Sequence, residues 1–156
     1  MAAMKISNFV QLRADGKLIP NGMTVKSMLS LGWEPSKVVA LRWTYGSHQV
    51  EFAPGPPVHA IVVPGEDFVA ALVYAGGEGA ASRLTIINPD GSIHGALENR
   101  LDVAGSTAAG EFGWFDPAMT PAANVFGTVF QTSSGDDLRC DIDASSRSVL
   151  RVARSR

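Results

Sequence analysis

Three histidines are the side chains of this sequence best suited to acid–base or metal chemistry, because an imidazole titrates near neutral pH. His48, His59 and His94 fall in three different predicted hairpins, and none has a second His, a Cys or an acid at a spacing that zinc sites use. His59 lies in the most apolar stretch, where a buried imidazole would need a hydrogen-bonding partner. We interpret all three as structural or solvent-facing.

Two aspartates could approach a divalent cation together. Asp141 and Asp143 are two residues apart in a predicted strand and would share one face. The segment that begins at Asp141 lacks the glycine at the sixth position and the carboxylate at the twelfth that a calcium-binding EF-hand loop requires. We therefore expect a charged solvent face, with no bound metal and no cofactor.

No local motif supplies a nucleophile. Cys140, the single cysteine, alternates with Leu138 and Ile142 and is predicted to face the core as a small hydrophobe. The glycine-rich residues 77–82 imitate a dinucleotide fingerprint but lead into a predicted strand instead of a helix. We expect a non-enzymatic protein, although an active site assembled from the distant residues His59, Glu111 and Asp116 stays open.

Composition indicates a single domain over residues 1–156, with 46% hydrophobic and 18% charged residues. The net charge of −2 gives no overall field that would attract nucleic acid or an anionic membrane. One cysteine cannot form an internal disulfide, which favours a reducing, cytoplasmic location. The most apolar region, residues 58–75, is interrupted at residues 64–67 and predicts two buried strands instead of a membrane span.

Arginines are concentrated at the end of the chain, where the last 18 positions hold Arg139, Arg147, Arg151, Arg154 and Arg156. They could form a basic strip for an acidic protein or RNA, but arginine on an edge strand also discourages unwanted strand pairing. We favour the edge-strand interpretation and expect no nucleic-acid partner.

The fold class is predicted to be mainly β. Alternating or short apolar runs recur at residues 38–44, 49–52, 58–63, 68–74, 83–87 and 92–97. Turn-forming residues lie between them, at residues 45–47, 54–57, 64–67, 76–79 and 88–91. Connections this short imply antiparallel neighbours, so we expect a meander of hairpins that forms a sandwich or a partly open barrel.

Both ends of the chain fit this pattern. A hairpin is predicted over residues 8–18, and Thr24 could cap a short helix that Gly32 ends. Residues 102–110 are small and polar and predict a loop, and residues 119–123 predict a second loop. Further strands are expected over residues 124–131, 138–142 and 149–153.

Aromatic side chains give the clearest functional indication. Phe112, Trp114 and Phe115, followed by Asp116, form a cluster that could anchor a protein partner, because Trp and other aromatics are favoured in interfaces. The alternative is that Trp114 plugs an open end of the sheet.

The order of features in the second half of the chain resembles small bacterial proteins that include toxin-neutralising immunity proteins. These features are the turn at residues 88–91 within residues 84–93, the aromatic residues 111–115, and the strands over residues 126–143. The resemblance implies a cytosolic, non-catalytic protein that binds a cognate toxin.

Two functional hypotheses follow. The leading one is a non-enzymatic protein-binding module that contacts its partner through Phe112, Trp114, Phe115 and Asp116. The second is a small-molecule-binding sandwich or barrel in which Trp43, His59 and Trp114 line a pocket. Homodimerisation through an edge strand is compatible with either.

Overall fold

The structure, a computed structural model, describes residues 5–74 and 82–154. Within these residues the chain forms thirteen strands and one short helix, α1 (Val25–Ser30). The strands are β1 (Ile6–Arg13), β2 (Leu18–Pro20), β3 (Val38–Tyr45), β4 (His48–Phe52), β5 (Val58–Val62), β6 (Val69–Tyr74), β7 (Ser82–Ile87), β8 (Ile93–Leu97), β9 (Arg100–Val103), β10 (Ser106–Asp116), β11 (Val125–Thr132), β12 (Asp137–Asp143) and β13 (Ser148–Arg154).

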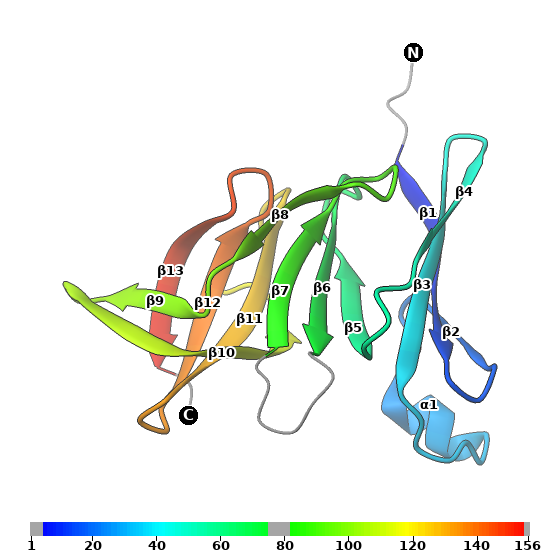
Figure 1. The fold of residues 1–156 in the computed structure, drawn as a ribbon, viewed down its shortest axis with the longest axis horizontal. Coiled ribbons are helices and arrows are strands. Elements are labelled where there is room, and N and C mark those ends of the chain that lie inside the picture. Colours follow the sequence, from blue (N-terminus) through cyan, green and yellow to red (C-terminus); the bar gives the residue numbers. More distant parts are fainter. Residues whose placement is uncertain (1–4, 75–81, 155–156) are drawn as a thin grey trace.

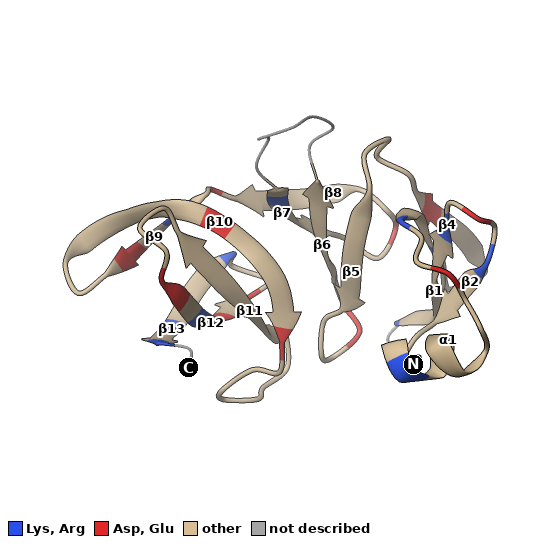
Figure 2. Ribbon diagram, turned by 90° about the horizontal axis from the view of Figure 1, so that it is seen from below, with Lys and Arg blue, Asp and Glu red and all other residues tan. Residues whose placement is uncertain are grey.

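The strands form three antiparallel sheets that lie side by side as layers (Figure 1). The first sheet has the order β2-β1-β3-β4, the middle sheet β5-β6-β7-β8, and the third sheet β13-β12-β11-β10-β9. The third sheet curls strongly, so that β10 arches over its neighbours (Figure 2). The predicted fold class, a mainly β meander of antiparallel hairpins with one short helix, is confirmed.

The middle sheet is covered on both faces. Along β6, Ala70 and Leu72 pack into the core shared with the third sheet, whereas Val69 and Ala71 pack into the core shared with the first sheet. All four side chains are fully buried. Residues that alternate in direction along one strand therefore join two separate cores, which explains why this stretch is apolar at every position.

The core between the middle and third sheets is the larger one. Its residues on the third sheet include Phe112, Phe126, Phe130 and Ile142. Cys140 also belongs to it, as the alternation with Leu138 and Ile142 predicts, and burial raises the pKa of its thiol to about 12. A thiol with so high a pKa remains protonated at neutral pH, where only the thiolate is a good nucleophile.

The first hairpin and the helix lie where the sequence predicts them. Leu12 pairs with Leu18 across the turn that contains Asp15 and Gly16. The hydroxyl of Thr24 accepts a hydrogen bond from the backbone N–H of Ser27 at 3.1 Å, which caps α1. However, none of the helix residues is buried, and Leu29 remains 67% exposed.

The loop predicted at residues 102–110 is wrong. These residues complete β9 and begin β10, which pair across a two-residue turn at Ala104 and Gly105. Both turn residues have positive φ, 50° and 83°, as a hairpin turn of this length requires. This turn lacks the Asn-Gly or Asp-Gly pair that identifies such turns in a sequence, and alanine rarely adopts positive φ. The sequence therefore does not reveal the turn.

Two further observations concern the described part of the chain. It contains no helix with the length and apolar character needed to cross a membrane. The turn predicted at residues 76–79 and most of the glycine-rich residues 77–82 lie outside the described residues.

Truncation of Leu72 should test whether the middle sheet supports the fold. Leu72→Ala removes a fully buried side chain from the larger core and should lower the free energy of unfolding by about 2–5 kcal/mol. Leu18→Ala, at a side chain that is 45% exposed, should change it by less than about 0.5 kcal/mol. Chemical denaturation of both variants measures the difference, and equal losses would contradict the assignment of the core.

Candidate protein-binding site

The predicted aromatic cluster lies at the end of β10, where the pairing with β11 is irregular. Phe112 pairs with Phe130, but the next pair joins Trp114 to Val129, so Gly113 forms a bulge. An extra residue reverses the direction of the side chains that follow it. Phe112 and Phe115 consequently both contact the core, while Trp114 is 38% exposed.

Phe112 and Phe115 differ in how much surface they offer. Phe112 is 1% exposed, and its ring packs edge-on against Phe130 with 5.0 Å between the ring centroids. It therefore stabilises the core and has almost no surface for a partner. Phe115 is only partly buried, between Phe126 at 6.0 Å and His59 at 5.5 Å.

An apolar groove of about 510 Å³ lies beside Phe115. One wall comes from the end of β5 and from Pro64. The other comes from the end of β10, the loop that follows it and the start of β11. The principal lining side chains are Ile61, Val62, Phe115, Pro117, Ala118 and Pro121. This groove, the Phe115 groove below, combines one aromatic ring with aliphatic and proline side chains, a surface suited to an apolar anchor from a partner.

Asp141 holds the loop wall of the Phe115 groove in place. Its carboxylate accepts hydrogen bonds from the backbone N–H groups of Met119 and Thr120, both at 2.8 Å. Asp141 is 2% exposed, so the expectation that it faces solvent beside Asp143 is wrong. Hydrogen bonds to a buried carboxylate are strong and directional, which makes this loop a fixed wall.

Both ends of the same loop are also fixed. A side chain at Gly127 would collide with the backbone oxygens of Asp116 and Pro117, at 2.4 and 2.6 Å from the added carbon, so only glycine permits this close approach. At the far end, Asn124 donates its N–H to the carbonyl of Pro64 at 2.8 Å. The groove is therefore largely formed before any partner arrives.

The remaining predicted site residue of the cluster, Asp116, lies at the edge of the groove. Its carboxylate is 3.9 Å from Nε of Arg139, and both side chains are 37% exposed. A pair this exposed contributes little to stability. It leaves one carboxylate and one guanidinium on the rim, where they can select a partner by charge.

Trp43 and His59 lie in different environments. Trp43 is 1% exposed in the core between the first and middle sheets, and its indole N–H donates to the carbonyl of Pro89. His59 projects from β5 toward Phe115 and keeps an exposed edge. The structure thus brings His59 to Phe115 but does not bring Trp43 to either.

The distant residues predicted for an active site each have a different partner. The carboxylate of Glu111 accepts a hydrogen bond from the backbone N–H of Ser82, whereas Asp116 pairs with Arg139 and the ring of His59 packs at a tilt against Phe115. Within residues 5–74 and 82–154, no hydrogen bond or ion pair joins any two of His59, Glu111 and Asp116. The same residues contain no cluster of three or more potential metal ligands.

Sequence reasoning missed most of the Phe115 groove. The sequence predicts that Ile61 and Val62 belong to a fully buried strand, and it predicts residues 119–123 only as a connecting loop. A signal was nevertheless present, because Pro117 and Pro121 restrict a loop that directly follows the aromatic segment.

By its fold the chain is a three-layer antiparallel β protein with a preformed apolar groove at one end of its third sheet. One chain of a solved structure, described as Tne2 in complex with Tni2, has the same fold, with a TM-score of 0.91 and 31% sequence identity. The match covers 97% of this chain and 99% of the other. The chain therefore belongs to the same family as that component of the complex. No protein-family model and no curated protein sequence matches it.

His59 offers a spectroscopic test of the packing beside the groove. Burial lowers its pKa below the ordinary value of 6.5, because a charged imidazolium loses hydration against Phe115. The imidazole should therefore titrate below 6.5 when followed by NMR, and Phe115→Ala should move its midpoint upward. The folded state binds this proton less readily than the unfolded chain does. Protonation of His59 should therefore lower the free energy of unfolding as the pH falls below 6.5. An unchanged midpoint in Phe115→Ala would contradict the contact.

Asp141→Asn should loosen the loop wall. An amide can accept from only one of the two backbone N–H groups without presenting its own N–H to the other, so we expect a loss of about 1–3 kcal/mol in unfolding free energy. Hydrogen exchange should accelerate at Met119 and Thr120. Asp137→Asn on the same strand is the control, because the Asp137 carboxylate accepts no hydrogen bond from the described residues. Equal exchange rates in the two variants would show that Asp141 does not hold the loop.

Proposed function

We propose that this protein is a non-enzymatic immunity-type protein that binds a cognate protein toxin and neutralises it. The observation that carries the proposal is its family relationship to a chain solved as part of a two-protein complex. The order of strands, turns and aromatic residues in the second half of the chain resembles that of immunity proteins, which supports a toxin as the partner.

The Phe115 groove is the surface that we propose for the toxin. Its walls are held by the carboxylate of Asp141 and by the tie between Asn124 and Pro64, so little conformational entropy is lost when a partner docks. Its lining is apolar, and Asp116 and Arg139 provide charge at the rim. This is the arrangement of a binding hot spot, in which an apolar centre is surrounded by polar groups.

Trp114 extends the proposed contact surface beyond the groove. The bulge at Gly113 turns this side chain outward, and its carbonyl accepts a hydrogen bond from the hydroxyl of Thr128 at 2.7 Å. A tryptophan held by its backbone presents a large rigid surface, and such side chains are over-represented among residues that dominate binding energy.

A charged side chain placed in the groove should block the partner without unfolding the protein. Ala118→Arg puts a long cation at the loop wall and should weaken binding at least about tenfold, since the apolar anchor of a partner would meet a desolvated charge. Ala53→Arg, at an exposed alanine outside the groove, should leave affinity unchanged.

The partner for this test is sought among the proteins encoded next to this chain. Each neighbouring protein is produced in a host with and without the chain, and relief of growth arrest identifies the toxin. Purified toxin is then titrated with the parent protein and with both variants by calorimetry. The proposal fails if no neighbouring protein is both toxic and bound, and the assignment of the groove fails if Ala118→Arg binds as well as Ala53→Arg.

A further inference from the structure

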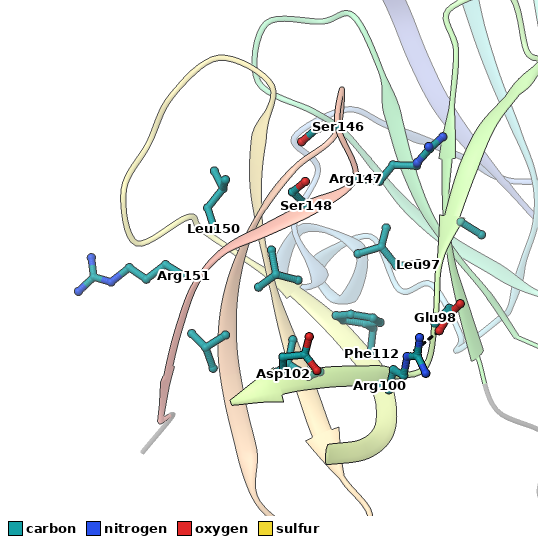
Figure 3. Close-up of a pocket in the computed structure, with 14 residues that line it drawn as sticks. Leu97, Glu98, Arg100, Asp102, Phe112, Ser146, Arg147, Ser148, Leu150 and Arg151 are labelled. Carbon is teal, nitrogen blue, oxygen red and sulfur yellow. Dashed lines mark ion pairs between the residues drawn. The ribbon is translucent and has the colours of Figure 1, made fainter. Parts of the chain in front are cut away.

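A second groove, which we call the seam, lies on another side of the third sheet. It has a volume of about 720 Å³ and runs between β13 on one side and β8 and β9 on the other (Figure 3). None of the residues that line it lines the Phe115 groove. The seam is therefore a separate surface.

The seam exists because the third sheet curls without closing. Its two edge strands, β9 and β13, both line the same groove, and β8, which leads into β9, is the edge strand of the middle sheet. Within the described residues each of these strands pairs with one neighbour alone. Every second residue along such an edge directs its backbone N–H and C=O away from the sheet, so the seam carries unpaired backbone donors and acceptors.

Side chains close one end of the seam. His94 on β8 shares a hydrogen bond of 2.7 Å between its Nε2 and the carbonyl of Ser145, in the turn that precedes β13. Arg147 from the same turn donates to the carbonyl of His94 at 2.6 Å and crosses Gly95, where a side chain would collide with it. The two strands are thus held together here and diverge along the rest of the groove.

The floor of the seam is apolar. On the β9 wall Asp102 has no ion-pair partner among the described residues, and on the β13 side Arg147 and Arg151 have none either. Leu97, Leu101 and Phe112 lie beneath the gap, with exposures of 8%, 2% and 1%. Glu98 and Arg100 form an ion pair at 2.6 Å (Figure 3). Asp102 points into the groove, and among the described residues its carboxylate accepts a hydrogen bond only from the hydroxyl of Thr107. No described cation lies within ion-pair distance of Asp102.

We propose that the seam takes an extended strand of a partner protein, which pairs with the free edge of β13. Unpaired backbone groups on both sides select a β-strand, because only an extended backbone matches their spacing. The apolar floor selects a strand with apolar side chains at alternate positions, and Asp102 selects a Lys or Arg on that strand.

A second copy of this chain does not fit the seam. Antiparallel pairing of β13 with its own copy, centred on the strand, would place Arg151 of each protomer opposite Arg151 of the other. Like charges on adjacent strands destabilise the pairing.

This inference rests on the proposed protein-binding function and adds a second, backbone-mediated contact to it. The probe is a synthetic peptide of about eight residues that alternates valine and threonine and contains one central lysine. Two-dimensional NMR should show shifts concentrated at the amides of β8, β9 and β13. The same peptide with alternate backbone nitrogens methylated should bind at least about tenfold more weakly, because it cannot donate the ladder hydrogen bonds.

A charge-reversal pair tests the selectivity of the wall. Asp102→Lys should weaken the peptide at least about tenfold, and Glu51→Lys, an exposed acid-to-lysine change on β4, should not alter its affinity. Absence of binding at about millimolar peptide, or equal binding of the methylated peptide, overturns strand addition. Equal binding to Asp102→Lys overturns the role of Asp102. Neither result affects the toxin test with Ala118→Arg, which probes the other groove.

Discussion

Burial of the middle sheet on both faces is the constraint on which the rest of the structure depends. Leu72 and its neighbour Ala71 point in opposite directions and enter different cores, so each outer sheet packs its hydrophobic face against one face of the middle sheet. The middle sheet cannot be left solvated on either side without exposing fully apolar strands. The first and third sheets are thereby placed on opposite sides of it, and both grooves are left at the periphery of the third.

Most of the strands could be predicted from the sequence because their turns are explicit. Asp15-Gly16 and the proline-containing turns define where the chain reverses, and alternation identifies the buried face of β12. The turn at Ala104 and Gly105 could not be recognised, since alanine at positive φ is stabilised by the surrounding strands and not by its own preference. Helix α1 could be predicted from its Thr24 cap. The exposure of its apolar side chains could not, because it depends on where the helix lies relative to the sheets.

The site was predictable only in part, because it depends on contacts between distant segments. Phe115 was identified as a candidate from its type, but its separation from Phe112 by a bulge depends on the pairing register with β11. The role of Asp141 was hidden for the same reason. Its alternation on β12 predicts an outward-facing carboxylate, and that prediction omits the loop that folds over it.

The hydrogen bonds that Asp141 accepts come from backbone N–H groups, which every residue except proline possesses. The shape of the loop is consequently independent of which side chains occupy positions 119 and 120. Relatives that retain the aspartate can exchange these side chains during evolution and keep the same framework. One carboxylate on a neighbouring strand thus fixes the backbone of the loop and leaves these two side chains free to vary.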